Sequence, residues 1–332
     1  MAGSRTEITE IVTGLGTLGG DLESYLVARP EQLVYVPDAV WQGIVLAYDE
    51  PANRQLFASA FESGVAFLRA LDGLRGRVPR LVEWKGPNRP PGDDVIPADL
   101  RVDHVFQISC KFLSKILQNC GPARLFERNL VGEQRTAHDW FAVTAGSQYQ
   151  TFYEAVRRAF VNELPPEVTS LRRPDRTVLK QVLRPRELPP DLRPAWAELC
   201  TAVSRESAAR WKANLTSQRA RLRMLWRLLR IGDAPYFILG AADGGRLRLR
   251  VASAWDWMQQ FDLRRFEVQP QRAGQPQVAW HAEVVERRAG SLRVIDGHVE
   301  IRWSHGRFQG SPEAKIYLDT PHSAVPGFFA LT

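Results

Sequence analysis

The clearest pattern of apolar and polar positions lies between Asn53 and Leu71, where apolar residues recur at helical spacing. This spacing places them on one face of an α-helix and leaves the other face polar. The apolar positions are Leu56, Phe57, Ala60, Phe61, Gly64, Val65, Phe67 and Leu68. The pattern predicts an amphipathic helix that ends at the turn sequence DGLRGR.

Residues 81–85 and 95–112 have patterns that are typical of β-strands. The sequence GPNRPPGDD between them cannot continue a strand because of its glycines and prolines, so we predict a loop there. Along VDHVFQISCK, successive side chains are expected to point to opposite faces. The apolar face would carry Phe106, Ile108 and Cys110, and the polar face Asp103, Gln107, Ser109 and Lys111.

The remainder of the chain contains helical, Pro-rich and alternating stretches. Helical patterns resume near Ser114 and again over 147–162. The Pro-rich, charged stretch over 164–194 is typical of a linker or an extended surface segment. Residues 195–230 form a long basic helical region, and the alternation from Tyr236 onward predicts a mainly antiparallel β part.

These elements predict an α/β (α+β) protein. We expect an α/β unit at 1–163 with its core at about 50–130, a linker or extended segment at 164–194, and a helical, then β-rich part at 195–332.

The overall charge points to a polyanionic partner. The formal net charge is +7 and the pI is about 9.6, and neutralising phosphates releases counterions, which drives association. Charge alone leaves DNA, RNA and an anionic membrane open. No apolar run reaches the roughly 18 residues that span a bilayer, and the N-terminus is unlike a signal peptide. We therefore expect a cytoplasmic protein that does not bind membranes.

Cysteine and histidine usage excludes several kinds of chemistry. Cys110, Cys120 and Cys200 lack CxxC spacing, so neither a disulfide framework nor a structural zinc site is expected. The six histidines show no ligand spacing. The chain has no Ser/His/Asp order, no P-loop and no dinucleotide fingerprint, so no small-molecule cofactor is expected.

Acidic side chains and a lysine fall on neighbouring predicted elements of residues 53–130. Glu62 lies on the helix, Glu83 on the first strand, Asp99 on the second, and Ser109 and Lys111 on the third. The basic side of the chain is mostly arginine, yet half of its six lysines fall within about thirty residues: Lys85, Lys111 and Lys115. A lysine ammonium is a compact charge and can take part in proton transfer, and a guanidinium cannot replace it in these roles.

This order of elements, with Pro97-Ala98-Asp99 ahead of Ser109-Cys110-Lys111, resembles the core of the PD-(D/E)XK nuclease superfamily. Type II restriction endonucleases are its best-known members. The resemblance covers about 60 of the 332 residues. It implies a restriction-endonuclease-like core with a mixed central sheet flanked by helices.

The resemblance also implies a set of roles around Mg²⁺. Asp99 would be the principal metal ligand, Lys111 would orient or activate the attacking water, and Glu62 would be the helical acid. Carboxylate oxygens suit this hard cation, which offsets charge on the transferring phosphoryl group. Ser109 stands where an acid is usual. Metal binding would therefore depend more on Asp99, Glu62 or Glu83.

A rival assignment uses the same motif at an earlier place. Asp72 followed by Glu83-Trp84-Lys85 also fits an Asp…Glu-x-Lys spacing. It is the less favoured assignment, because Asp72 falls at the end of a helix and the polar face over 103–111 would be left without a role.

Two stretches could hold a nucleic acid. The first is the arginine-rich region 205–230, whose positive charges spread around the helix. The second lies near the C-terminus, where basic and polar side chains surround a glycine and could contact phosphates or base edges. Its alternative is a hairpin with exposed arginines. The candidate binding residues are Lys115, Arg302, Ser304, His305, Arg307 and Lys315.

These features predict a Mg²⁺-dependent DNA endonuclease that cuts duplex DNA, with the second half of the chain as the candidate DNA-recognition region. The resemblance implies a type II restriction enzyme in host defence, which by analogy would act as a homodimer. The alternative is a non-catalytic DNA-binding protein with a degenerate nuclease fold. An RNA-processing or RNA-binding protein is a third class, which the charge allows but no recognised RNA module supports.

Overall fold

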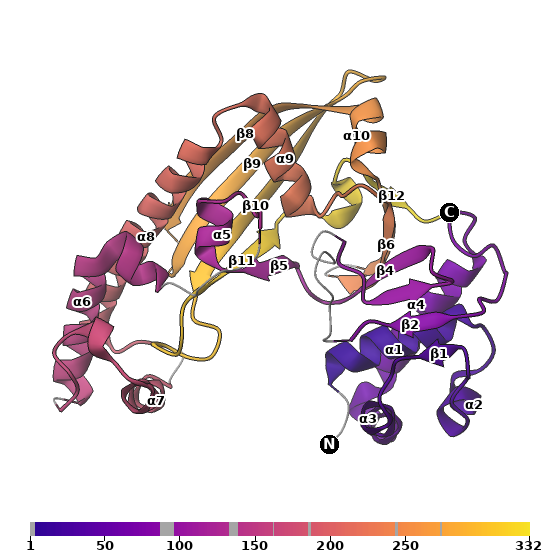
Figure 1. The fold of residues 1–332 in the computed structure, drawn as a ribbon, viewed down its shortest axis with the longest axis horizontal. Helices are drawn as coiled ribbons and strands as arrows, with labels where there is room; N and C mark the ends of the chain where they lie inside the picture. Colours follow the sequence, from indigo (N-terminus) through magenta and orange to yellow (C-terminus); the bar gives the residue numbers. More distant parts are fainter. Residues whose placement is uncertain are drawn as a thin grey trace.

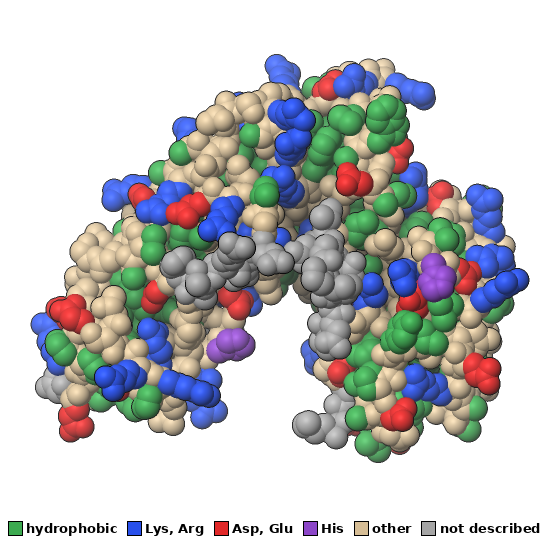
Figure 2. Space-filling model, in the orientation of Figure 1, with side chains coloured by type: hydrophobic (Ala, Val, Ile, Leu, Met, Phe, Trp, Pro, Cys, Tyr) green, Lys and Arg blue, Asp and Glu red, His purple; other side chains and the backbone are tan. Residues whose placement is uncertain are grey.

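The computed structural model describes residues 4–86, 96–132, 139–161, 163–184, 187–242, 245–272 and 274–332. These residues form two lobes that meet at the top of the view in Figure 1 and leave a hollow between them. Figure 2 shows the same hollow with side chains in place. Each lobe is built around its own β-sheet.

The first lobe contains a sheet whose strand order, within the described residues, is β1-β2-β3-β4-β6-β7-β12. β2, β3 and β4 form an antiparallel meander, and β4 pairs in parallel with β6, so the sheet is mixed. The strands are β1 (Leu33–Val34), β2 (Val82–Trp84), β3 (Leu100–Val102), β4 (Phe106–Phe112), β6 (Tyr236–Ala242), β7 (Gly245–Val251) and β12 (Phe328–Ala330). The helices of this lobe are α1 (Arg5–Thr17), α2 (Leu22–Val27), α3 (Asp38–Tyr48) and α4 (Arg54–Arg69).

α1 and α4 pack against each other through two glycines. A Cβ added to Gly16 would lie 2.1 Å from the carbonyl oxygen of Phe61, and one added to Gly64 would lie 2.1 Å from that of Thr13. Only glycine allows helix backbones to approach this closely. The apolar faces of both helices share one core with the sheet. The contact therefore fixes α1 over the strands that carry the candidate site.

The second lobe contains a sheet of strand order β5-β11-β10-β9-β8, with α8 packed across β8 and β9. The strands are β5 (Ile116–Cys120), β8 (Phe261–Arg272), β9 (Pro276–Glu286), β10 (Leu292–Arg302) and β11 (Glu313–Leu318). The helices are α5 (Pro122–Phe126), α6 (Trp140–Phe160), α7 (Arg173–Val182), α8 (Arg193–Asn214), α9 (Gln218–Leu229) and α10 (Ala254–Gln260).

The two lobes share β6 and β7 as a common wall. Phe237 and Leu239 face the core of the first lobe, whereas Tyr236, Ile238 and Leu249 belong to the core of the second lobe. β5 comes from the first half of the chain but joins the second sheet, and β6, β7 and β12 come from the second half but join the first sheet. Sheet membership thus crosses the divisions expected at residues 163 and 194.

Most of the elements expected from the sequence are present. The fold is mixed α/β, the helix over 53–71 is α4, and the strand over 81–85 is β2. The region 95–112 contains β3 and β4, joined by a turn at Asp103. The helix expected over 147–162 is α6, and the C-terminal part is antiparallel β. Of the predicted loop at 86–94, residues 87–94 lie outside the described residues.

The helix expected near Ser114 is wrong, because residues 116–120 form β5. Pairing with β11 overrides the local helical pattern, as Lys315 and Ile316 oppose Asn119 and Gln118. The segment 164–194, expected as a linker or extended segment, contains α7 and several leucines that are buried in the core of the second lobe. None of the described helices is long and apolar enough to cross a membrane.

Candidate active site

Asp99 lies immediately before β3, and the backbone of β4 holds it. The Asp99 N–H donates to the Ile108 carbonyl at 2.8 Å, and the Asp99 carbonyl accepts from the Lys85 N–H at 2.9 Å. Its carboxylate oxygen Oδ2 accepts from the Cys110 N–H at 2.7 Å and from the Ser109 hydroxyl at 3.3 Å. The residue is 8% exposed. These contacts fix the orientation of a nearly buried carboxylate.

Ser109 and Lys111 alternate with Cys110 along β4. Ser109 is 1% exposed, whereas Gln107 and Lys111 on the same predicted polar face are partly exposed, so this face is covered at Ser109. The Lys111 ammonium lies 3.5 Å from the Ile116 carbonyl, where β5 begins. β6 runs so close that a Cβ on Gly240 would lie 1.8 Å from the Lys111 carbonyl oxygen, and Gly240 adopts a φ of +135°. The backbone beneath Lys111 is therefore tightly constrained.

A cavity of about 760 Å³ opens beside these residues, where the chain passes from β4 in the first sheet to β5 in the second. Its walls come from α1, the segment before β3, β4, β5, α5 and the end of α9. Several of these elements border the hollow in Figure 1. Among the described residues, its cationic lining residues are Arg5, Lys111, Arg124 and Arg230, and its carboxylates are Glu10 and Asp99. This excess of cations suits an anionic ligand.

Glu10 is the site residue that the sequence analysis missed. It lies on α1, is 9% exposed, and its Oε2 accepts a hydrogen bond of 2.7 Å from the Trp84 indole N–H. A signal was present, because Ile8, Ile11 and Leu15 have helical spacing around an acid. The sequence around Glu10, however, does not reveal that this acid faces the strand that carries Lys111.

The thiol of Cys110 lies close to both carboxylates. Burial raises the pKa of this thiol well above its ordinary value, and the negative charges of Asp99 and Glu10 raise the pKa further. Cys110 also packs against the core of the first lobe, which agrees with its expected role as a small apolar residue. Asp99 and Glu10 therefore both lie near this neutral thiol, and both line the cavity.

The other two predicted acids lie in different surroundings. Glu62 is 51% exposed and forms an ion pair of 2.7 Å with Arg246 beside a different cavity. The Glu83 side chain is 3% exposed and accepts two hydrogen bonds of 2.6 Å from Arg101, with His104 at 3.1 Å. The Arg101 guanidinium holds the pKa of the Glu83 carboxyl below its ordinary value. The structure therefore groups Asp99, Ser109 and Lys111 but not Glu62 or Glu83.

The two acids of the rival assignment, Asp72 and Glu83, contact different side chains. Asp72 accepts from the Thr332 hydroxyl at 3.2 Å and lies 3.9 Å from Arg250. Glu83 is engaged with Arg101. The Asp72 and Glu83-x-Lys85 pattern thus gains no geometric support.

The six candidate nucleic-acid residues fall into three groups. Lys115 is exposed in the turn between β4 and β5. Arg302 and Lys315 lie on β10 and β11, both close to Glu300. The remaining three lie in the connection from β10 to β11, where the Ser304 hydroxyl donates to Glu313, Arg307 donates to the Leu183 carbonyl at 3.0 Å, and His305 is exposed.

Oxygen ligands for a divalent cation are present, although in small number. Among the residues that the structure describes, no group of three or more His, Cys, Asp or Glu side chains is placed to hold a metal ion. Mg²⁺ is commonly bound by one or two carboxylates, with waters and substrate phosphate completing its shell. Asp99 and Glu10 could therefore hold Mg²⁺, with the anionic substrate completing the site.

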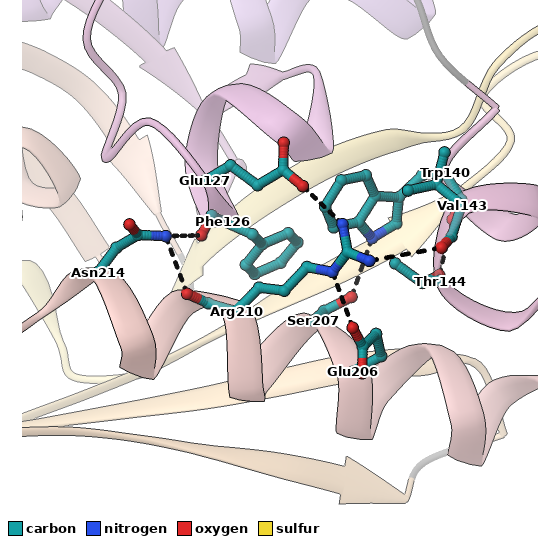
Figure 3. Close-up of polar contacts among 9 residues, drawn as sticks. All are labelled: Phe126, Glu127, Trp140, Val143, Thr144, Glu206, Ser207, Arg210 and Asn214. Carbon is teal, nitrogen blue, oxygen red and sulfur yellow. Dashed lines mark hydrogen bonds and ion pairs between the residues drawn. The ribbon is translucent and has the colours of Figure 1, made fainter.

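Within the second lobe, Arg210 on α8 contacts residues of α6 and the end of α5 (Figure 3). Its guanidinium donates to Glu127 at 2.6 Å and to Glu206 at 2.9 Å, and lies 5.4 Å from the centroid of the Trp140 ring. On the next turn of α8, the Asn214 amide donates to a carbonyl at the end of α5 at 3.0 Å. Because α5 carries a cation that lines the cavity, this cluster helps to set the shape of the site.

Comparisons with protein-family models, curated proteins and solved structures gave no match to this chain.

Proposed function

We propose that this protein is a Mg²⁺-dependent endonuclease that hydrolyses phosphodiester bonds in duplex DNA. The observation that carries the proposal is the convergence of Asp99, Ser109 and Lys111 with Glu10 in one cation-rich cavity. Several elements that form this cavity border the hollow in Figure 1, which supports the same proposal, because a duplex needs an open groove to reach a cleavage site.

Each site residue has a role that its contacts support. Asp99 and Glu10 supply carboxylate oxygens for Mg²⁺, which when bound would offset negative charge on the phosphoryl group. Ser109 acts as a positioning residue, because its hydroxyl donates to the Asp99 carboxylate. The Lys111 ammonium stabilises negative charge on the attacking water and on the phosphate oxygens.

The positive lining of the cavity favours a polyanion. Phosphates approaching Arg5, Arg124 and Arg230 would find guanidinium groups suited to bidentate contacts. By the resemblance to type II restriction enzymes, the proposed role is cleavage of foreign duplex DNA in host defence, with a homodimer placing one site on each strand.

A second candidate function is non-catalytic DNA binding with a degenerate nuclease site. The observations that favour it are the serine at position 109 and the lack, among the described residues, of a group of three metal-binding side chains. Such a protein would bind duplex DNA equally well with and without Mg²⁺ and would cut none.

The test is incubation of the purified protein with unmethylated phage and plasmid DNA, with Mg²⁺ or with EDTA. Asp99→Ala and Lys111→Ala are assayed beside the natural protein. The proposal predicts discrete fragments that require Mg²⁺ and disappear in both variants. Uncut but shifted DNA in every lane would favour the binding protein, and preferential binding or cleavage of RNA would favour the third class.

A further inference from the structure

The helix α7 and its flanking residues present a basic surface. Arg172, Arg173, Lys180 and Arg184 are exposed, and they are called the α7 surface below. Among the described residues, no carboxylate forms an ion pair with any of these four side chains. Asp175, the acid of this helix, instead accepts a hydrogen bond of 2.8 Å from the Arg172 backbone N–H at the start of the helix. The positive charges therefore remain available to an outside anion.

Contacts with the connection between β10 and β11 hold α7 rigidly. The Arg176 guanidinium donates to the Phe308 carbonyl at 2.8 Å, and the Gln309 amide donates back to the Arg176 carbonyl. Arg307 donates to the carbonyl of Leu183 at the end of α7. The Lys180 side chain packs over Gly306, the residue before Arg307 in the connection. A Cβ added to Gly306 would lie 3.1 Å from the Cγ of Lys180.

That connection is itself anchored in the aromatic core of the second lobe. The Phe308 ring stacks with Tyr149 and Phe152, with centroid distances of 5.8 and 5.7 Å, and Trp303 lies 5.1 Å away. Phe308 and Tyr149 are fully buried. The backbone that carries the α7 surface is therefore held in place, so that binding has to order the side chains alone, which lowers the entropic cost of association.

The α7 surface lies at the end of the second lobe, next to the hollow. Figure 1 places α7 and the β10–β11 connection on this lobe, across the hollow from the first lobe. Figure 2 shows Lys and Arg side chains gathered over the part of the lobe where Figure 1 places α7. A duplex that reaches the cavity through the hollow would pass this end of the lobe.

We infer that the α7 surface is a phosphate-binding arm. It binds the backbone of a duplex DNA at a point distant from the cavity, while another part of the same duplex reaches the cavity. Exposed cations without carboxylate partners are the groups that release counterions from DNA on contact. The inference rests on the proposed function only for the identity of the polyanion, because the arm would bind DNA whether or not the cavity cleaves it.

A membrane surface fits α7 less well. Interfacial helices insert an apolar face between lipids, but the apolar side of α7 is already buried within the protein, with Leu179 at 0% and Leu183 at 4% exposed. Val178 is 37% exposed, and Val182 is partly buried against the core of the second lobe. The helix therefore offers charge without an apolar face.

The test measures binding of a labelled duplex by fluorescence anisotropy in EDTA over a series of salt concentrations. The variant carries Arg172→Gln, Arg173→Gln, Lys180→Gln and Arg184→Gln. The matched control removes four arginines at the far end of the second sheet: Arg264→Gln, Arg287→Gln, Arg288→Gln and Arg293→Gln. A third protein replaces the three α7-surface arginines by lysine and so keeps the charge. Thermal unfolding of each protein verifies that it is folded.

The inference predicts that the α7 variant binds duplex DNA at least about tenfold more weakly. The slope of log affinity against log salt should also become shallower, by about 0.9 for each phosphate that the variant no longer neutralises. The control variant and the lysine variant should bind within about twofold of the natural protein. Equally weakened binding by the control variant would overturn the inference, because net charge alone would then explain binding. The same assay is repeated with RNA and with anionic vesicles. If the α7 variant binds only these more weakly, and duplex DNA as well as the natural protein does, the inference is overturned.

These results are independent of cleavage. If the natural protein cuts no DNA but the α7 variant binds it more weakly, the arm stands and the proposed nuclease activity fails. If the natural protein cuts DNA but the α7 variant binds and cuts as well as the natural protein, the arm fails and the nuclease stands.

Discussion

Each of the two sheets has a polar strand face, and the two faces differ in what covers them. On the second sheet, His281 lies 2.7 Å from Asp296 and His298 lies 2.9 Å from Asp319, and all four side chains are partly exposed. On the first sheet, the polar face at Ser109 is buried, and β5 and α5 close it into a cavity.

The difference shows what an alternating pattern can and cannot reveal. Both faces arise from the same period of two along a strand. In the second sheet, polar and acidic side chains pair with one another, as expected for a solvated face. In the first sheet, a helix from the start of the chain and strands from its middle bring charges of both signs around a space large enough for a ligand.

The largest expected difference between the two polar faces is in the rate of DNA cleavage when a lysine on each face is replaced. Lys111→Ala should lower the rate of DNA cleavage on the order of a thousandfold, because it removes an ammonium that stabilises transition-state charge. Lys315→Ala on β11 should leave the rate within about twofold when the protein saturates the DNA, in contrast to the DNA-binding role expected for Lys315 from the sequence, since Lys315 opposes Glu300 on β10. Single-turnover cleavage of a plasmid measures both rates, and equal effects would remove the distinction between the two faces.

The Glu83–Arg101 pair should give the largest effect on stability near the site. Arg101→Ala should lower the free energy of unfolding at neutral pH by about 2 kcal/mol, because it removes two hydrogen bonds from a buried carboxylate, while the Arg101 side chain itself is 37% exposed. Arg287→Ala, which removes the partner of Asp262 in an exposed pair, should cost about 0.5 kcal/mol. Urea unfolding measures both values.

The sign of the pH dependence follows from the lowered pKa of Glu83. The pair stabilises the folded state fully above the ordinary carboxyl pKa of 4.5, and this stabilisation is lost as the pH falls through the lower pKa of the folded state. The stability difference between the natural protein and Arg101→Ala should therefore shrink in acid. A difference that grows in acid would contradict the assignment of the pair.

The site seen in the structure contains the helical glutamate Glu10, whereas the site expected from the sequence contains the helical glutamate Glu62. Variants of these two residues test which site is correct. Glu10→Gln should reduce cleavage by roughly tenfold to a hundredfold and raise the Mg²⁺ concentration needed, because it removes a carboxylate from the cavity. Glu62→Gln should have little effect, since Glu62 is half exposed beside another cavity. A Mg²⁺ titration of the cleavage rate compares them, and the reverse ranking would restore the sequence-based assignment.

A smaller effect is expected at the cluster in Figure 3. Arg210→Ala should lower the free energy of unfolding by about 1–2 kcal/mol, because the guanidinium joins α5, α6 and α8 and is only 30% exposed. Arg265→Ala is the control, as its ion pairs with Glu267 and Glu283 lie on the exposed sheet face. If both variants unfold at the same urea concentration, the cluster does not stabilise the lobe.

Much of the fold was predictable because local patterns carry it. The apolar stripe of α4 and the apolar face of β4 depend on neighbouring residues, and both are confirmed. The burial of Ser109 on the opposite face of β4 was not expected. β5 was missed because its stability comes from pairing with β11, nearly 200 residues later in the chain. The helix within 164–194 was obscured by its prolines, although Pro174 lies in the first turn of α7, where the missing N–H costs little.

The site was predictable in part for the same reason. Asp99 lies immediately before β3, and Ser109 and Lys111 lie on the adjacent strand β4, so their spacing in the sequence reflects their proximity. Glu10 reaches the site only because Gly16 and Gly64 allow α1 to pack closely on α4, a contact between distant segments that no local pattern reveals. Glu62 and Glu83 carry the expected chemistry but face arginines, which only the tertiary structure shows.

The most direct test of the candidate site is a calorimetric titration with Ca²⁺, which prefers oxygen ligands as Mg²⁺ does, in the presence of duplex DNA. The natural protein is compared with Asp99→Asn and with Asp319→Asn, which changes an acid on the second sheet's polar face. We predict metal binding to the natural protein and to Asp319→Asn, and binding at least about tenfold weaker to Asp99→Asn. Undiminished binding to Asp99→Asn, or no binding to the natural protein, would contradict this prediction.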